Sequence, residues 1–192
     1  MTAPGVAEAM ARVRRAWFLP PAVAARAGED APLRIGHGAT CSQPTTVAHL
    51  LTHLDARPGE RVLDLGSGSA WTTALLAALV GPRGVVVGVE LEPALVAAGR
   101  AHLVAAAAHG LDVSAARIEQ AAPGVLGWPA GAPYRRILVS AEARHVPDEL
   151  VAQLTDHGRM VIPVGRRLLV VDRHGDALRT RDVGAYRFVP LR

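Results

Sequence analysis

Residues 61–71 read RVLDLGSGSAW, an apolar run that ends in an acid and then in two glycines two positions apart. Glycine has no Cβ, so such a turn between a strand and a helix lets the backbone approach a ligand closely. The turn also directs unpaired N–H groups at the start of the helix toward that ligand. Three roles fit this stretch alone: a loop around a pyrophosphate, a loop around another nucleotide, or a tight turn without a ligand.

The residues of the turn argue against a pyrophosphate. The dinucleotide-binding fingerprint has a third glycine three residues after the second, and this chain has Trp71 at that position. A Walker-type phosphate loop needs a lysine, and all 21 basic residues of the chain, counting Lys and Arg together, are arginines. We therefore expect a nucleotide that is held without a phosphate contact.

Two acids favour S-adenosylmethionine as the cofactor. Glu90 closes the apolar run VVVGVE, and an acid at the end of the second strand can accept hydrogen bonds from both ribose hydroxyls. Asp64 precedes the glycines, where a carboxylate attracts a cationic ligand. S-adenosylmethionine has a ribose, an ammonium and a sulfonium but no phosphate. The alternative is that Asp64 is an ordinary turn acid and Glu90 a solvated strand end.

The hydrophobic pattern predicts an α/β fold. Strands are expected at 61–66, 84–90, 113–119, 135–141, 158–165, 166–173 and 185–190, and helices at 4–16, 45–54, 69–80, 93–110 and 147–154. Pro20-Pro21 is expected to stop the first helix, and residues 28–45 read as an irregular loop. Alternating strands and helices predict a doubly wound, mostly parallel, Rossmann-like sheet. We expect a single domain over 1–192, with N-terminal helices and a substrate and cofactor loop in 1–58 and the Rossmann-like core in 59–192.

The composition excludes several classes of protein. Half of the residues are apolar and 20% are charged, which is typical of a globular domain. We expect no membrane span, because no apolar run reaches about 18 residues, and no signal peptide. The net charge of +4 comes without a long basic block, so nucleic-acid binding is not expected. The single cysteine, Cys41, fits a reducing cytoplasm, and the histidine spacing predicts no metal site.

A second stretch, PLRIGHGATCSQP at residues 32–44, resembles the segment ahead of the cofactor domain in protein-L-isoaspartate O-methyltransferases, whose pattern is P-x-x-I-G-x-G-x-T-x-S-x-P. The likeness covers nearly the whole chain. The opening helix VAEAMARVRRAWFLPP, the motifs VLDLGSGSAW and VVVGVELEP, and then GWPAGAPYRRILVSA, VPDELVAQL, GRMVIPVG and RFVPL follow in the family's order.

The resemblance implies a class I methyltransferase fold and methylation of the free carboxylate of L-isoaspartyl residues in damaged proteins, which starts repair through a succinimide. It implies isoaspartyl proteins or peptides as partners, and we expect a monomer. The family's active-site serine falls on Ser42, and the substrate is expected to contact His37, Thr40 and Ser42; a positional role for His37 is equally consistent. The expected cofactor contacts, including the two acids, are Ala39, Thr40, Cys41, Ser42, Asp64, Gly66, Ser67, Gly68, Glu90, Leu91, Pro123 and Gly124.

The chain departs from the family pattern at three places. Ala122-Pro123-Gly124 replaces the usual Gly-Asp-Gly, whose acid lies near the adenine, and Arg136 follows Tyr134-Arg135 where the family has Tyr-Asp. The segment from Ala141 to Arg144 replaces a small apolar one. These changes leave two alternatives open: an aspartyl O-methyltransferase that tailors a dedicated peptide, and a drifted paralogue with weak or no activity.

Overall fold

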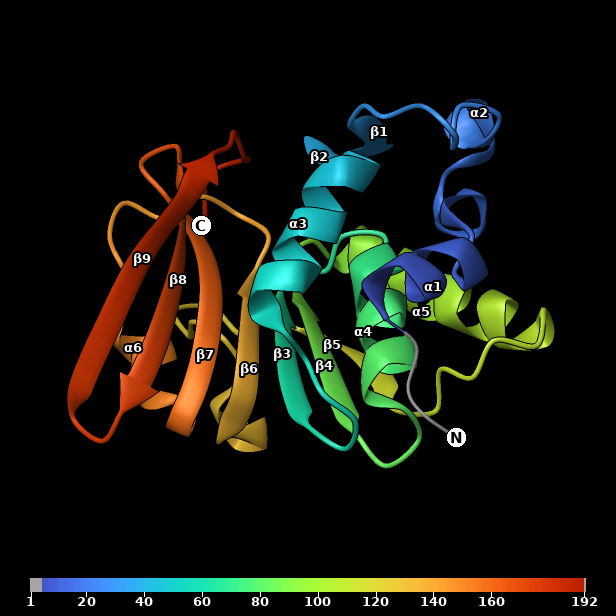
Figure 1. Cartoon of the computed structure of the whole chain (residues 1–192). Coiled ribbons are helices and arrows are strands. Elements are labelled where there is room, and N and C mark those ends of the chain that lie inside the picture. Colours follow the sequence, from blue (N-terminus) through green and yellow to red (C-terminus); the bar gives the residue numbers. More distant parts are fainter. Residues whose placement is uncertain (1–4, 192) are drawn as a thin grey trace.

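A computed structural model describes residues 5–191 and places a seven-stranded sheet at the centre of the molecule (Figure 1). The strands are β3 (Arg61–Leu65), β4 (Val85–Glu90), β5 (Ala116–Gln120), β6 (Tyr134–Val139), β7 (Leu154–Val164), β8 (Arg167–His174) and β9 (Ala177–Ala185). A separate two-stranded hairpin is formed by β1 (Leu33–Gly36) and β2 (Ala39–Cys41). The helices are α1 (Val6–Arg12), α2 (Pro21–Ala24), α3 (Pro44–Leu54), α4 (Trp71–Val80), α5 (Pro93–Ala108) and α6 (Asp148–Ala152), with short 3-10 helices at Arg15–Phe18 and Pro129–Gly131.

The sheet order is β5-β4-β3-β6-β7-β8-β9. The first five strands in this order are parallel to one another, whereas β8 and β9 run antiparallel to their neighbours. Successive strands move outward from β3 to β5, and the chain then returns to place β6 on the other side of β3. The β3–β6 boundary is therefore a topological switch point, the position where open α/β sheets bind ligands at the carboxyl ends of the strands.

The two faces of the sheet are buried in separate apolar layers. Val62, Val86 and Leu138 face a layer that contains α1, α3, α4 and α5, whereas Leu63 and Val87 face a layer that contains α6. In Figure 1 the helices α1, α3 and α4 lie in front of the sheet and α6 lies behind it. The parallel strands are consequently apolar on both faces, as a covered parallel sheet requires. The predicted doubly wound, mostly parallel α/β fold is confirmed.

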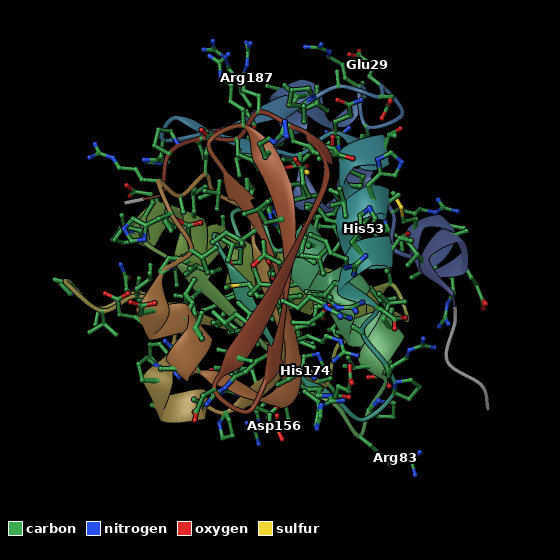
Figure 2. The ribbon with its side chains drawn as sticks, turned by 60° about the vertical axis from the view of Figure 1, so that its left-hand side comes forward. Glu29, His53, Arg83, Asp156, His174 and Arg187 are labelled. Carbon is green, nitrogen blue, oxygen red and sulfur yellow. The ribbon has the colours of Figure 1, made fainter. Side chains whose placement is uncertain are left out.

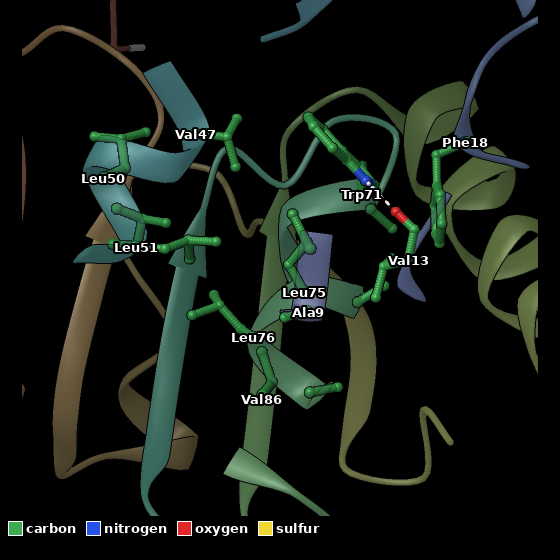
Figure 3. Close-up of a cluster of buried hydrophobic side chains, with 14 of the residues drawn as sticks. Ala9, Val13, Phe18, Val47, Leu50, Leu51, Trp71, Leu75, Leu76 and Val86 are labelled. Carbon is green, nitrogen blue, oxygen red and sulfur yellow. Dashed lines mark hydrogen bonds between the residues drawn. The ribbon is translucent and has the colours of Figure 1, made fainter. Parts of the chain in front are cut away.

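Trp71 joins the N-terminal segment to the apolar layer that contains α3, α4 and α5. The whole of α4 is apolar apart from two threonines, and Trp71 at its start is 3% exposed. Its indole Nε1 donates a hydrogen bond to the carbonyl of Val13 at 3.0 Å, within a cluster that includes Phe18 and Leu75 (Figure 3). This contact holds the chain that follows α1 against the helix that follows the glycine turn.

The N-terminal region differs from the sequence prediction. The helix expected at 4–16 begins at Val6, after the extended Gly5, and ends at Arg12. A 3-10 helix follows it, and residue 4 lies outside the described residues. Pro21 does not end a helix but opens α2, where the missing N–H of a proline is tolerated. The expected irregular loop at 28–45 contains the β1–β2 hairpin, because Gly36, His37 and Gly38 all take positive φ values and reverse the chain.

The C-terminal prediction is also corrected. The last strand is β9 at Ala177–Ala185, not 185–190, where the chain makes only an isolated bridge between Pro190 and Glu142. Gly175, at a φ of +60°, provides the turn between β8 and β9. The exposed β9 sequence has no apolar alternation for a pattern search to detect. Every other predicted element is present with its ends shifted by a few residues, and none of the helices within residues 5–191 is long and apolar enough to cross a membrane.

Gly88, in the middle of β4, provides a test of this packing. A Cβ built on Gly88 would lie 2.6 Å from Ile118 Cδ1, 2.9 Å from Thr73 Oγ1 and 3.1 Å from Ser67 Cβ. We expect Gly88→Ala to lower the free energy of unfolding by about 1–3 kcal/mol, as overpacking of a core does. Urea denaturation measures the change.

Gly28→Ala is the matched control for this substitution. A Cβ on Gly28 meets nothing within 4 Å, so its free energy of unfolding should change by less than about 0.5 kcal/mol. Equal losses in the two variants would contradict the close packing of β4 against α4.

Candidate active site

One cavity of about 770 Å³ lies at the carboxyl ends of β3, β4 and β6. Its volume is in the range of pockets that bind small organic ligands. Its walls come from the β1–β2 hairpin and the residues after it, the two turns that follow β3 and β4, and the segments after β5 and β6. Residues 187–191 close one side. In Figure 2 Arg187 lies at one end of the molecule and Arg83, Asp156 and His174 at the other.

The turn after β3 needs its glycines for conformational reasons. Gly66 and Gly68 have φ values of +81° and +51°, in the region that favours glycine. The N–H groups of Gly66 and Ser67 both donate to the carbonyl of Val89, at 2.9 and 3.1 Å, which fixes the turn to the end of β4. Both glycines line the cavity, so a ligand can approach this backbone closely.

Glu90 fixes the two turns relative to each other. Its Oε2 accepts a hydrogen bond from Gly68 N at 2.9 Å, and its Oε1 accepts from Leu91 N at 2.7 Å and from Glu92 N at 3.0 Å. The carboxylate is thus held at the cavity wall by three backbone N–H groups, one from the first turn and two from the second. An oxygen so oriented retains lone pairs for the hydroxyls of a ligand.

Asp64 lies buried beneath the cavity rather than on its surface. One of its oxygens accepts a hydrogen bond from Thr73 Oγ1 at 2.6 Å, and Oδ1 has no partner among the described residues. Burial raises the pKa of this carboxyl to about 7, opposed by the Thr73 hydrogen bond and supported by the nearby charge of Glu90. A buried acceptor without a partner is rare in folded proteins and marks this position, directly beneath the glycine turn, as exceptional.

Ser42 reaches the cavity from the end of the β1–β2 hairpin. The residues Ala39, Thr40 and Ser42 line the cavity on this side, as does His37 at the hairpin turn. His37 Nδ1 lies 3.6 Å from Glu92 Oε1, so the hairpin turn contacts the turn that follows β4. The hairpin therefore faces the glycine turn and Glu90 across a single cavity.

The structure brings most of the predicted site residues to this cavity. Those that line it are His37, Ala39, Thr40, Ser42, Gly66, Gly68, Glu90, Leu91, Pro123 and Gly124. The other three predicted residues, Cys41, Asp64 and Ser67, are buried and do not line it. Cys41 points into the protein because β2 alternates its side chains between two faces, and burial raises the pKa of its thiol.

The sequence analysis missed several lining residues. Gln43, Thr46 and Ser140 belong to the cavity, and so does the segment from Arg187 to Leu191. Ser140 lies at the carboxyl end of β6, within the strand expected at 135–141, and ligands bind at the carboxyl ends of such strands, so its position could have been inferred. The segment 187–191 matches a family motif, RFVPL, to which the sequence assigns no role. It reaches the cavity through long-range hydrogen bonds, from Glu142 N to Val189 O at 2.7 Å and from Leu191 N to Glu142 O at 2.8 Å, which no local pattern reveals.

Two histidines far apart in the sequence meet away from the cavity. His157 Nδ1 and His174 Nδ1 lie 3.1 Å apart beside Asp156, at the opposite end of the molecule from Arg187 (Figure 2). Within residues 5–191, no group of three or more His, Cys, Asp or Glu side chains is arranged to hold a metal ion.

Comparison with known proteins identifies related chains. A family model described as protein-L-isoaspartate(D-aspartate) O-methyltransferase matches residues 1–192. A protein-L-isoaspartate O-methyltransferase of Anaeromyxobacter dehalogenans (strain 2CP-C) is 44% identical, covering 97% of this chain and 88% of the relative. A protein of the same name from Aeropyrum pernix is 43% identical, covering all of this chain and 74% of the relative.

A solved structure from Plasmodium falciparum shares the fold. That protein is described as a candidate protein-L-isoaspartate O-methyltransferase in complex with S-adenosyl-L-homocysteine. It matches this chain with a TM-score of 0.85 at 24% identity, over 97% of this chain and 89% of its own.

The buried Asp64 predicts a specific dependence of stability on pH. The folded carboxyl has a pKa of about 7, whereas an unfolded aspartate has a pKa of about 3.9. Between these values the folded state binds more protons than the unfolded state, so stability falls as pH rises. We expect the free energy of unfolding of the ligand-free protein, relative to Asp64→Asn, to be highest below pH about 4 and to decline until pH about 7.

Urea denaturation across this pH range measures the difference. Asp176→Asn, at an exposed turn, is the control. The free energy of unfolding of the unmodified protein relative to Asp176→Asn should not decline between pH about 4 and about 7. A flat difference between the unmodified protein and Asp64→Asn would show that the carboxyl is not buried as described.

Proposed function

The chain belongs to the protein-L-isoaspartate(D-aspartate) O-methyltransferase family, and from this membership we infer that it transfers a methyl group from S-adenosylmethionine to the free carboxylate of L-isoaspartyl residues in damaged proteins. The observation that carries the inference is the convergence of three separate segments on one cavity. The glycine turn and Glu90 form one side, and Ser42 faces them from the hairpin.

We propose that the turns after β3 and β4 hold the cofactor. Glu90 would accept hydrogen bonds from the ribose hydroxyls, because its carboxylate is already oriented by three N–H groups. The open backbone at Gly66 and Gly68 would contact the amino-acid part, with the negative Glu90 favouring its positive charges. A bound cation would in turn favour the ionised form of the buried Asp64. Pro123 and Gly124 carry no carboxylate, so we propose that the adenine packs there against an apolar wall that includes Val125 and Leu126.

The bound cofactor supplies a methyl group made electrophilic by a sulfonium. The protein's own task is then mainly to align the substrate carboxylate with the methyl group. An isoaspartyl carboxylate with a pKa of about 4 is already ionised at neutral pH and needs no general base. The Ser42 hydroxyl would donate a hydrogen bond to the carboxylate and set its direction of approach. The cavity walls would exclude water, so that the carboxylate is the nucleophile present. The methyl ester formed can lose methanol when the following backbone nitrogen attacks it, and hydrolysis of the resulting succinimide returns part of the damage to normal aspartate.

We also propose that the protein acts as a monomer in the cytoplasm. The single, buried Cys41 supports a reducing compartment, since nothing in the chain can form an internal disulfide. Size-exclusion chromatography with light scattering tests the oligomeric state.

The activity is tested with two peptides that are identical except for isoaspartate or aspartate at one position. We expect base-labile label from S-adenosylmethionine on the isoaspartyl peptide alone. Label on the aspartyl peptide would instead support a peptide-tailoring enzyme. Absence of cofactor binding would support an inactive paralogue.

Removing the Ser42 hydroxyl should weaken transfer without unfolding the protein. A hydrogen bond to a charged group contributes about 1.5–3 kcal/mol, so Ser42→Ala should lower kcat/KM for the isoaspartyl peptide by about 10- to 100-fold. Ser114→Ala, whose hydroxyl donates to Asp112 on an exposed loop, is the matched control and should match the unmodified protein. Full activity in Ser42→Ala would show that the Ser42 hydroxyl does not contribute to methyl transfer.

Changing Glu90 should act on cofactor affinity. The Glu90→Gln variant places an amide NH₂ against backbone N–H donors and loses one charged acceptor. We expect the Kd for S-adenosylhomocysteine, measured by calorimetry, to rise about 10- to 100-fold. Glu149→Gln, exposed on α6, should leave the Kd unchanged. An unchanged Kd in the Glu90 variant would rule out the ribose contact.

A further inference from the structure

We infer that Arg15 is a positioning residue of this active site, which orients the loop around Ser42 so that its hydroxyl and two backbone N–H groups face the substrate carboxylate. The inference rests on the proposed function. Arg15 begins the 3-10 helix Arg15–Phe18, does not line the cavity, and is only 6% exposed.

The guanidinium of Arg15 is buried without an acidic partner. Within residues 5–191 it makes no ion pair, and all of its hydrogen bonds go to neutral groups of the chain that leads into and out of the β1–β2 hairpin. The acceptors are Ala27 O at 3.3 Å, Glu29 O at 3.0 Å, Ala31 O at 2.8 Å, Cys41 O at 2.9 Å, Ser42 O at 3.0 Å and Cys41 Sγ at 3.5 Å. One side chain thus gathers the segment before β1 and the end of β2 around a single planar group.

Two of these contacts set the peptide planes on either side of Ser42. The carbonyls of Cys41 and Ser42 both accept from Arg15 Nη2. In a trans peptide the N–H points opposite to the carbonyl of the preceding residue. The N–H groups of Ser42 and Gln43 are therefore turned away from Arg15. Both residues line the cavity, and we infer that these N–H groups face it.

These two N–H groups are available to a ligand. Neither of them donates to another backbone group within the described residues. Together with the Ser42 hydroxyl they make three donors in two consecutive residues, which is an arrangement that binds anions. Hydrogen bonds to a carboxylate are stronger than those between neutral groups, so a loop held in this orientation would both bind and align the isoaspartyl carboxylate.

The charge of Arg15 contributes in the same direction. A guanidinium stays protonated in proteins, and here it bonds to carbonyls and lies over the face of Trp71, whose centroid is 5.4 Å from Cζ. The carboxylates of Glu29 and Asp30 make no ion pair with Arg15 but lie near enough for its charge to help lower their pKa values. The positive charge lies behind Ser42, whereas Glu90 lies across the cavity. One positive charge therefore lies behind the wall that carries Ser42, and the carboxylate of Asp30, which accepts from Gln43 Nε2 at 2.9 Å, lies beside the same wall.

The test compares Arg15→Ala, Arg15→Lys and the control Arg14→Ala, which removes an exposed arginine one residue away. Displacement of an aligning group typically lowers a rate by about 100-fold, so we expect kcat/KM of Arg15→Ala for the isoaspartyl peptide to fall by about that factor, with less than about a threefold change in Kd for S-adenosylhomocysteine. Lysine keeps the charge but lacks the planar fork, so Arg15→Lys should fall by about tenfold. Arg14→Ala should match the unmodified protein.

A second readout separates positioning from general stability. Free guanidinium ion at a non-denaturing millimolar concentration should restore kcat of Arg15→Ala by about tenfold or more, because it can occupy the space left beside the carbonyls, whereas urea at the same concentration should not. Amide hydrogen exchange at residues 42 and 43 should be faster in both Arg15 variants. If Arg15→Ala does not fold, Arg15→Lys supplies the same two comparisons of exchange and kcat/KM.

The inference is overturned if the Arg15 variants keep the kcat/KM of the unmodified protein. It is also overturned if the affinity for S-adenosylhomocysteine and kcat/KM fall in the same proportion and guanidinium restores neither of them. Failure of the proposed function has a different signature, namely no methyl transfer to the isoaspartyl peptide by the unmodified protein. In that case the exchange measurement still decides the role of Arg15, since unchanged exchange at residues 42 and 43 refutes it and faster exchange supports it.

Discussion

The carboxylate of Glu90 joins the two turns on which the cavity depends. Its three acceptor bonds link Gly68 in the first turn with Leu91 and Glu92 in the second. Because the same carboxylate closes β4 and faces the cavity, the bonds that stabilise the turns also fix the group proposed to recognise the cofactor. The parallel pairing of β3 with β4 and β6 brings the remaining walls to the same edge of the sheet.

Two buried ionisable groups lie behind opposite walls of the cavity. Asp64 lies under the glycine turn with one oxygen unpaired, and Arg15 lies behind Ser42 with carbonyls as its only hydrogen-bond acceptors apart from a thiol. Burial of a charge without a directly bonded opposite charge is unfavourable in a protein interior, which is why the pKa of Asp64 is raised. Proteins retain such unfavourable groups mainly at sites that bind a ligand. The substrate and cofactor expected of this family carry the complementary charges on the corresponding sides.

Much of this architecture was predictable from the sequence because it depends on local pattern. Alternating apolar runs located every strand of the parallel part of the sheet, and the acid–glycine–acid order around Asp64 and Glu90 indicated the nucleotide side of the cavity. What could not be predicted depends on long-range contacts. The hairpin before Ser42 reverses at a non-glycine residue, His37, with a φ of +51°. The wall at residues 187–191 is held by a partner more than forty positions away. The burial of Asp64, and with it the shift of its pKa, depends on the packing of α4, whose Thr73 donates to this carboxyl.

The two outer strands of the central sheet affect how readily the protein aggregates at high concentration. An edge strand presents unpaired N–H and C=O groups that can pair with a strand from another molecule. Here one edge is β9, which is exposed along nearly its whole length and carries Arg179, Arg181 and Asp182, and the other is β5, with Arg117 and Glu119. Charged side chains on both edges oppose strand addition and so resist the growth of cross-molecule sheets. An enzyme that meets damaged, partly unfolded chains gains from this, because those chains expose the segments most ready to extend a sheet.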